Sequence, residues 1–426
     1  MAEYGPGREF ALRLDAEDAL ASRRELFYVK PGQIYMDGNS LGLCSKPAEQ
    51  AVLRALEDWK KHGIGIWTGA ETDYFLYFER IGAKLARLIN AQPEEVTVCA
   101  STTLNIHQCI ATFWRPDERR YKIVVDELNF PTDRYAVTSQ IRQRGLDVDE
   151  VLRVIPSRDG KTLAMEDILA ALTEDVSIVL LPSVLYRSAQ LLDMAAITKA
   201  AHEKGIICGF DLCHSIGAVD HDMEAVDCDF AVWCNYKYLS GGPGATAGLY
   251  VNRRHFGLEP GLAGWWGNRN DTQFELRPEF EHMLNAGGWQ TGTSPILSMA
   301  AVDGALDAYE GLTMAEVRAR SLKLTEYLMY LIDTELAGYG FTIGNPRENA
   351  VRGGHVALEH ADAVRINEAL KAADVVPDFR YPNVIRLAPS PLYTSFAEVW
   401  EFVRRLREIM DTKAYEKFSD KAGTVA

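Results

Sequence analysis

Short runs of β-branched or apolar residues alternate with longer amphipathic stretches between about residues 70 and 300, and this alternation limits the possible fold more than any other feature. Strands that alternate with helices in this way form a mostly parallel sheet flanked by helices. The sequence therefore predicts a large α/β domain. Its predicted strands are 96–99, 122–125, 177–181, 205–210, 230–233 and 247–251, and two of its predicted helices are 165–172 and 194–204.

The pattern changes after about residue 310. A long helical pattern at 313–336 is followed by short strand patterns at 354–358 and 384–387 and by a last helix at 395–410. This order is typical of a smaller α+β domain, and 426 residues are too many for one ordinary core. We expect an N-terminal segment (1–65) that packs with the small domain, a large domain (66–309) and a small C-terminal domain (310–426).

Charge and cysteine usage limit the partners. The formal net charge of -15 argues against nucleic acid or an anionic membrane, because both attract concentrated positive charge. The first residues lack a basic segment followed by an apolar core, so we expect a cytoplasmic protein that acts on a small molecule. Seven cysteines without a CxxC pair favour reduced, buried thiols, and the sequence predicts no metal site.

Lys237 lies between the apolar run 229–234 and a glycine-rich turn at 241–244. The run reads as a buried strand, and the glycines allow the backbone to turn sharply beside a bound group. A lysine amine is almost entirely protonated at neutral pH, so a reactive lysine must be desolvated, lie beside a cation or already be condensed with an aldehyde. The alternative is an ordinary exposed lysine in a loop.

Three further clusters follow predicted strands, at the sheet edge where α/β proteins usually bind ligands. Residues 100–105, with Thr102 and Thr103, open a helix whose N–H groups suit a phosphate, although a Ser/Thr helix cap explains them as well. Asp211 ends an apolar strand and suits a protonated ring nitrogen, or else caps the next segment. Phe130 suits stacking on an aromatic cofactor, or else belongs to a proline-fixed loop.

Together these clusters are more specific than each alone. A phosphate-binding helix start, an aromatic platform, a strand-end aspartate and then a lysine before a glycine turn occur in this order in aspartate-aminotransferase-like (fold type I) enzymes, which use pyridoxal 5'-phosphate.

The chain resembles the kynureninase family over most of its length. The resemblance is carried by residues 37–42, 130–133, 209–214, 236–239, 264–267 and 385–393. It implies hydrolytic cleavage of kynurenine between Cβ and Cγ, which gives anthranilate and alanine, and the corresponding cleavage of 3-hydroxykynurenine. It also implies a place in tryptophan catabolism, on the kynurenine pathway that serves NAD biosynthesis.

The resemblance also implies roles for particular residues. Lys237 would form the Schiff base with the cofactor, Asp211 would pair with the pyridine nitrogen, and Tyr236 would be a phosphate ligand or a proton donor. Trp265 and Thr293 would reach the cofactor of a neighbouring subunit, which implies a homodimer with shared active sites. The other implied cofactor residues are Thr102, Thr103, Phe130, Asp133, Ser183 and His214, and the implied substrate residues are Arg386, Asn39, Ser40, His62 and Trp67.

Two alternatives remain at this point. Another fold-type-I lyase or aminotransferase, such as a cysteine desulfurase, would share the cofactor residues, but no cysteine follows Cys234 to act as its nucleophile. A binding protein that keeps the fold without catalysis would tolerate loss of Lys237 or Asp211, and both are present. Thr293, where some relatives have asparagine, favours unsubstituted kynurenine as the substrate.

Overall fold

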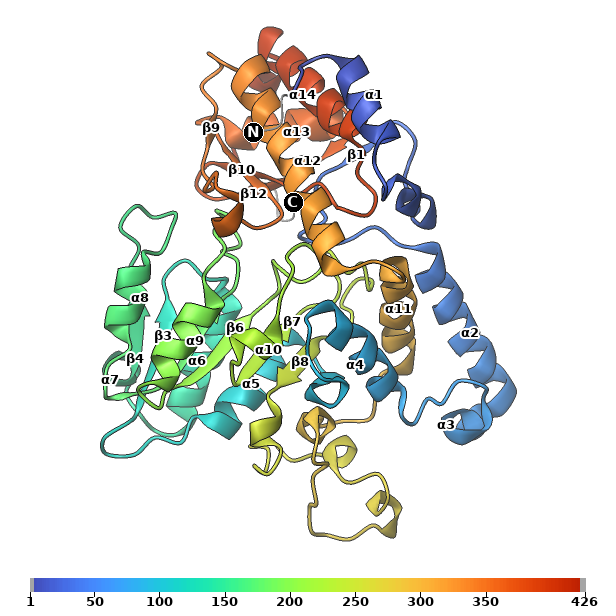
Figure 1. The fold of residues 1–426 in the computed structure, drawn as a ribbon, viewed down its shortest axis with the longest axis vertical. Helices are drawn as coiled ribbons and strands as arrows, with labels where there is room; N and C mark the ends of the chain where they lie inside the picture. The colour runs from blue at the N-terminus through green and yellow to red at the C-terminus, as the bar shows by residue number, and fades with distance from the viewer. Residues whose placement is uncertain (1–3, 422–426) are drawn as a thin grey trace.

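A seven-stranded sheet forms the centre of the larger unit in the computed structural model, which describes residues 4–421 (Figure 1). Only β8 runs antiparallel to its neighbours, so the sheet is mostly parallel, and the predicted fold class is confirmed. The order across the sheet is β2 (Val96–Val98), β8 (Gly248–Val251), β7 (Phe230–Trp233), β6 (Ile207–Asp211), β5 (Val176–Pro182), β3 (Lys122–Asp126) and β4 (Leu152–Ile155).

Both faces of this sheet are buried. Along β5, Ile178 and Leu180 pack into one hydrophobic cluster, whereas Val179 and Leu181 pack into another. Successive side chains of a strand point to opposite faces, so the two clusters are the two sides of the sheet. One side carries α5 (Thr102–Phe113), α6 (Pro131–Gln143) and α7 (Val148–Val151), and the other carries α4 (Tyr77–Leu88), α8 (Met165–Ala171), α9 (Met194–His202), α10 (Met223–Val226) and α11 (Ile296–Leu306).

Every strand predicted for the large domain is present, with ends shifted by a few residues at most. Strand β4 was missed, because three of its four residues are only half-buried and the alternation of apolar residues is weak at this sheet edge. None of the helices within residues 4–421 is long and apolar enough to cross a bilayer.

The smaller unit, orange to red in Figure 1, has its own antiparallel sheet and its own hydrophobic cluster. Its long helices begin where Thr313 and Ser395 form capping boxes with Glu316 and Glu398. The sheet order is β12 (Asp378–Arg380), β13 (Val384–Leu387), β10 (Val356–Glu359) and β9 (Thr342–Ile343), and the helices are α12 (Met314–Glu335), α13 (Ala363–Ala372) and α14 (Phe396–Asp411).

The N-terminal segment contacts both units. Helix α1 (Arg8–Ala16) packs on α14, and β1 (Ile34–Tyr35) pairs with β11 (Val375–Val376) of the smaller unit. Helix α2 (Lys46–His62) instead packs along α11 of the larger unit, and α3 (Ile66–Gly69) follows it. The segment therefore crosses from one unit to the other, although it was expected to pack with the small domain alone.

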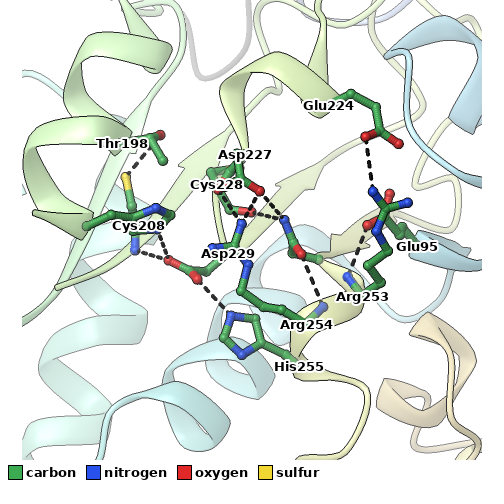
Figure 2. Close-up of polar contacts among 12 residues, drawn as sticks. Glu95, Thr198, Cys208, Glu224, Asp227, Cys228, Asp229, Arg253, Arg254 and His255 are labelled. Atoms are coloured by element: carbon green, nitrogen blue, oxygen red, sulfur yellow. Dashed lines mark hydrogen bonds and ion pairs between the residues drawn. The ribbon is translucent and has the colours of Figure 1, made fainter. Parts of the chain in front are cut away.

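A buried aspartate connects three segments at the amino-terminal ends of β6 and β7, opposite their carboxyl ends (Figure 2). Asp229, which directly precedes β7, is 2% exposed. Its Oδ2 accepts the backbone N–H of Cys208 at 2.7 Å and lies 2.9 Å from Nε2 of His202, while its Oδ1 lies 2.7 Å from Nε2 of His255. One carboxylate thus joins β6, α9 and the chain that leaves β8.

Candidate active site

A cavity of about 300 Å³ lies at the carboxyl ends of β5 and β6. Three distant parts of the chain line it: Asn39 and Ser40 from the N-terminal segment, residues of the large sheet and its loops, and Arg380 and Arg386 from the smaller unit. Its volume suits a small organic ligand.

Lys237 projects into this cavity from the turn after β7. Its Nζ lies 2.8 Å from Nε2 of His214. Burial lowers the pKa of Lys237, but its electrostatic interactions with the neighbouring acidic groups, including Asp211, outweigh burial, and the net shift is upward. Burial and the charge of Lys237 lower the pKa of His214 well below its usual value. A charged lysine therefore donates to a neutral histidine.

The N-terminal segment packs directly on the lysine turn. Gly42 donates its N–H to the carbonyl of Tyr236 at 2.8 Å. A Cβ at residue 42 would lie 2.4 Å from the carbonyl oxygen of Lys237, so only glycine fits this close approach. This contact explains why the motif at 37–42 accompanies the lysine motif.

Two carboxyl groups lie beside the lysine. Asp211 ends β6, lines the cavity, and its Oδ1 accepts the N–H of Cys213 at 2.6 Å. Asp133 on α6 is 1% exposed and accepts a hydrogen bond from Asn129 at 2.6 Å. Burial, and then the charge of Asp211, raise the pKa of Asp133 well above its usual range. Asp133 therefore favours its protonated form.

The N-terminus of α5 forms another wall. Ser101 caps the helix by accepting the N–H of Leu104, and the hydroxyls of Thr103 and Thr132 lie 2.7 Å apart. Ser101, Thr102, Thr103 and Thr132 all line the cavity. The first N–H groups of a helix have no intrahelical acceptor and carry a partial positive charge, so this wall suits an anion such as phosphate.

Aromatic rings lie opposite the lysine. The Phe130 ring centroid is 6.0 Å from Nζ of Lys237, and Phe130 contacts Tyr186 edge-to-face at 5.5 Å. Phe130 is 44% exposed even though it lies at a cavity wall. An exposed face of this kind is available to stack on a planar ligand.

Arg386 on β13 is 1% exposed and lines the cavity from the smaller unit. Its guanidinium forms an ion pair with the buried carboxylate of Asp378. It also donates to the carbonyl of Tyr186 at 2.9 Å and to the hydroxyl of Ser40 at 2.8 Å. These contacts hold a cation beside the cavity, where it suits a ligand carboxylate.

The cavity has the donors that pyridoxal phosphate requires. Asn39 lines the cavity and is fully buried, yet neither atom of its amide has a hydrogen-bond partner among the described residues. A buried polar atom without a hydrogen-bond partner destabilises the fold unless a ligand or a water molecule supplies that partner. The helix start fits the phosphate, Phe130 the ring, Asp211 the pyridine nitrogen and Lys237 the aldehyde.

Several residues expected at the site lie elsewhere. Ser183 is fully buried and its hydroxyl bonds to the carbonyl of Asp211 and to Ser215, so it supports β6 from behind. Trp67 packs on Trp266, and Trp265 is 41% exposed. The residues expected at this chain's own site that do not line the cavity are Asp133, Ser183, His62 and Trp67. Trp265 and Thr293 were expected to reach the cofactor of a neighbouring subunit, and that assignment stays a prediction.

Other residues at the cavity were not assigned from the sequence. Tyr186 and Arg380 line it, and Asp378 lies behind the two arginines. The pattern Asp378-Phe379-Arg380 places both charged side chains on one face of a strand. This alternation is the sequence feature that could have identified the two residues. Within residues 4–421, no group of three or more His, Cys, Asp or Glu side chains has the arrangement to hold a metal ion.

Comparison with known proteins gives whole-length relatives. The family described as the kynureninase C-terminal domain matches residues 317–406. A kynureninase of Geobacillus thermodenitrificans is 51% identical over 421 residues, which cover 99% of this chain and 98% of the relative. A kynureninase of Bacillus cereus is 51% identical over 423 residues, which cover 99% of each chain.

Solved structures with the same fold are far more distant in sequence. A C-DES mutant with glycine covalently linked to its PLP cofactor has a TM-score of 0.79 at 16% identity, over 90% of this chain and 99% of that one. A cysteine desulfurase from Thermococcus onnurineus has a TM-score of 0.76 at 18% identity, over 92% and 98% of the two chains. At these identities the likeness concerns the fold alone.

Proposed function

This chain belongs to the kynureninase family, and from that premise we propose that its cavity hydrolyses L-kynurenine between Cβ and Cγ to anthranilate and L-alanine. The observation that carries the proposal is that Lys237, Asp211 and Arg386, from two separate units, line a single cavity. A lysine and a carboxylate at one end and a buried arginine at the other match an amino-acid substrate of an enzyme that uses pyridoxal phosphate.

The enzyme uses pyridoxal phosphate, which when bound supplies an electron sink for the negative charge that develops on the substrate. We propose that Thr102, Thr103 and Tyr236 hold the phosphate. Phe130 stacks on the ring, and Asp211 keeps the ring nitrogen protonated. Asp133 and His214 adjoin these groups, and Ser183 supports Asp211 from behind.

Lys237 acts twice in this proposal. Its amine would hold the cofactor, and the same amine, once free, would remove the proton from Cα of the bound substrate. Its 2.8 Å contact with Nε2 of His214 orients the amine. Arg386 holds the α-carboxylate, which fixes Cα beside Lys237.

Cleavage then requires water at the γ-carbonyl and a proton at Cβ. Water adds to the carbonyl, the Cβ–Cγ bond breaks, the aryl fragment leaves as anthranilate, and Cβ takes a proton to become the methyl group of alanine. We propose that Tyr236 donates that proton. Burial, and then the charge of Cys234, raise the pKa of Tyr236 above its usual value, so its phenol keeps its proton at neutral pH.

A direct assay separates this function from its main alternative. Purified protein is incubated separately with kynurenine, 3-hydroxykynurenine and cysteine, and aryl-amine fluorescence, alanine and sulfide are followed. We expect anthranilate and alanine in equal amounts, and none from Lys237→Ala. Release of sulfide without an aryl product would instead assign the cysteine desulfurase chemistry of the structural neighbours. Borohydride reduction should fix the cofactor on Lys237, and a colourless protein that takes up no pyridoxal phosphate would refute the site.

We further propose that two copies form a homodimer with shared sites. Exposed apolar side chains on α2, in the turn directly after it and in the segment 265–297 support this, because large exposed apolar groups mark interaction surfaces. They include Trp59 (56% exposed), Ile64 (86%), Trp265 (41%), Phe274 (69%), Leu276 (71%) and Leu297 (42%). In such a dimer Trp265 and Thr293 reach the partner's cofactor, and His62 and Trp67 lie near the substrate.

Mixing two inactive variants tests the shared site. Lys237→Ala and Trp265→Ala each damage every site of their own homodimer. If Trp265 serves the partner's site, a mixed dimer has one site with both wild-type residues, so activity should rise on mixing after brief dissociation. Mixing Lys237→Ala with Asp211→Ala is the matched control, because both residues belong to one chain's site and that mixed dimer has no intact site. No recovery in the first mixture, or a monomer in sedimentation, would contradict the dimer.

The remaining assignments are proposals of the same kind. The division at residues 65/66 and 309/310 stays a prediction. We propose that the protein works in the cytoplasm, which its seven free cysteines support. Its place would then be in tryptophan catabolism on the kynurenine pathway, with a link to NAD biosynthesis.

A further inference from the structure

Three charged side chains meet at the end of the cavity that the smaller unit forms. Asp378 on β12 is paired directly opposite Arg386 on β13, and Arg380 lies two residues further along β12. Opposed residues of paired strands, and alternate residues of one strand, share a face of the sheet. The three side chains therefore lie on one face, and both arginines line the cavity.

Asp378 contacts both arginines through one oxygen. Its Oδ2 forms an ion pair with the Arg386 guanidinium and lies 3.1 Å from Nε of Arg380. Asp378 is fully buried and Arg386 is 1% exposed, whereas the Arg380 side chain is 34% exposed. Asp378 is therefore shared between a buried cation and a cation that is open to the cavity.

The donors of Arg386 are largely used within the protein. Its Nε donates to Asp378, Nη1 to the carbonyl of Tyr186 and Nη2 to Ser40, and Nη2 also forms the ion pair with Asp378. A guanidinium has five N–H donors, so these four contacts leave one donor for a ligand. Arg386 alone is a fixed but nearly saturated partner for a carboxylate.

The charges at this end do not cancel. Asp378 offers one negative charge to two arginines. The nearby carboxyl group of Asp37 does not supply the second below neutral pH, because burial and then the charge of Asp378 raise its pKa to about 7. One positive charge is left over. An arginine charge inside a protein needs an anionic partner, and the cavity is where that partner can enter.

We propose that the substrate carboxylate is bound by two arginines, Arg386 and Arg380, and that Asp378 is the positioning residue that holds both. Arg380 supplies the free donors and the uncompensated charge, and Arg386 supplies the fixed end of the site. This inference deepens the proposed function and rests on it, because it assumes a substrate with an α-carboxylate.

The test compares L-kynurenine with its carboxamide, which keeps the amine and the aryl ketone but lacks the negative charge. For Arg380→Gln we expect kcat/KM for the acid to fall by roughly 30-fold, mainly through KM, as one charge-assisted contact of about 2 kcal/mol requires. The value for the carboxamide should change by less than about threefold. Arg380→Lys should restore part of the loss, and Arg407→Gln, an exposed arginine on α14, is the matched control. Equal losses for acid and carboxamide would show a structural role and overturn the assignment, as would no loss for either.

Asp378→Asn separates positioning from charge. The substitution makes this end of the cavity more positive, so if Asp378 only neutralised charge, the acid would bind more tightly. As a positioning residue, its loss should weaken acid binding by at least about tenfold, with the cofactor absorbance unchanged. Tighter acid binding would overturn the positioning role.

A second measurement keeps the inference independent of turnover. Titration of the cofactor absorbance with L-alanine and with L-alaninamide reports carboxylate recognition without C–C cleavage. Wild-type protein that binds alanine but does not cleave kynurenine would refute the proposed function alone. Equal affinity of wild type and Arg380→Gln for alanine would refute the two-arginine site alone.

Discussion

Asp229→Ala should destabilise the large unit, because Asp229 connects three segments at the end of the sheet opposite the cavity. The substitution removes the acceptor of three contacts, at 2.7 to 2.9 Å, from Cys208 N–H, His202 and His255. The Cys208 N–H is fully buried, and an unsatisfied buried donor costs about 1–3 kcal/mol. The two histidine side chains are 26% and 13% exposed, so water takes over part of their bonding. We expect the free energy of unfolding to fall by about 4 kcal/mol.

Urea unfolding followed by tryptophan fluorescence, at saturating pyridoxal phosphate, measures this loss. Asp227→Asn is the matched control, since Asp227 lies two residues away with a 57% exposed side chain in a surface ion pair. That variant should lose less than about 1 kcal/mol. Folded Asp229→Ala should keep the KM for kynurenine, because the residue is remote from the cavity.

The pH dependence of the same variant gives a second criterion. Burial raises the pKa of Asp229, but its bonds with His202, His255 and Cys208 outweigh burial and lower the pKa. A lowered folded-state pKa gives stability that is present above the unfolded pKa of about 4 and is lost as pH falls below it. The difference between wild type and variant should therefore shrink by about 1.4 kcal/mol for each pH unit below 4. A loss under 1 kcal/mol at pH 7, or a difference that does not shrink in acid, would refute this reasoning.

Three further variants test the cavity and the sheet. Arg386→Ala should raise KM for kynurenine roughly 100-fold, equivalent to about 3 kcal/mol, while the cofactor absorbance persists; loss of that absorbance would mean that Arg386 supports the cofactor instead. Gly248→Ala would place a Cβ 2.0 Å from the Trp233 indole, and it should lower the free energy of unfolding by more than about 3 kcal/mol in thermal unfolding. Gly257→Ala is the control, because open space surrounds that residue, and it should lower the free energy of unfolding by less than about 1 kcal/mol. Asp37 has a pKa raised to about 7, so its proton is lost, and a negative charge appears beside the arginines, as pH rises through 7. In the wild-type protein, kcat/KM for kynurenine should therefore fall as the pH rises above 7. Asp37→Asn should show no such fall. If the fall persists in Asp37→Asn, it belongs to another titrating group.

The sheet was predictable because its central strands are buried on both faces. Runs such as 178–181 are apolar throughout, which edge strand β4 is not. Strands β1 and β11 have two residues each and form only because distant segments meet. Two residues are too few for an alternation of apolar and polar side chains to predict a strand.

The site was predictable where chemistry is local to a strand end. Lys237, Asp211 and Thr102 lie at the carboxyl ends of parallel strands in one sheet, and these ends lie on the same side of the sheet. Tyr186 and Arg380 reach the cavity only through the placement of one unit against the other, which no local pattern encodes. The roles proposed for Trp265 and Thr293 require a second chain, so they stay predictions.

The division of the cavity between units has a consequence for protein engineering. The groups that we propose to act on the reacting carbons belong to residues 101–237, whereas the two arginines belong to a contiguous stretch, 380–386. Exchange of β12 and β13 with those of a relative would change which end group of a substrate is accepted while the bond-breaking residues stay in place. The N-terminal segment limits this modularity, since Gly42 contacts the lysine turn and Ser40 contacts Arg386. A chimera should therefore take both stretches from the same parent.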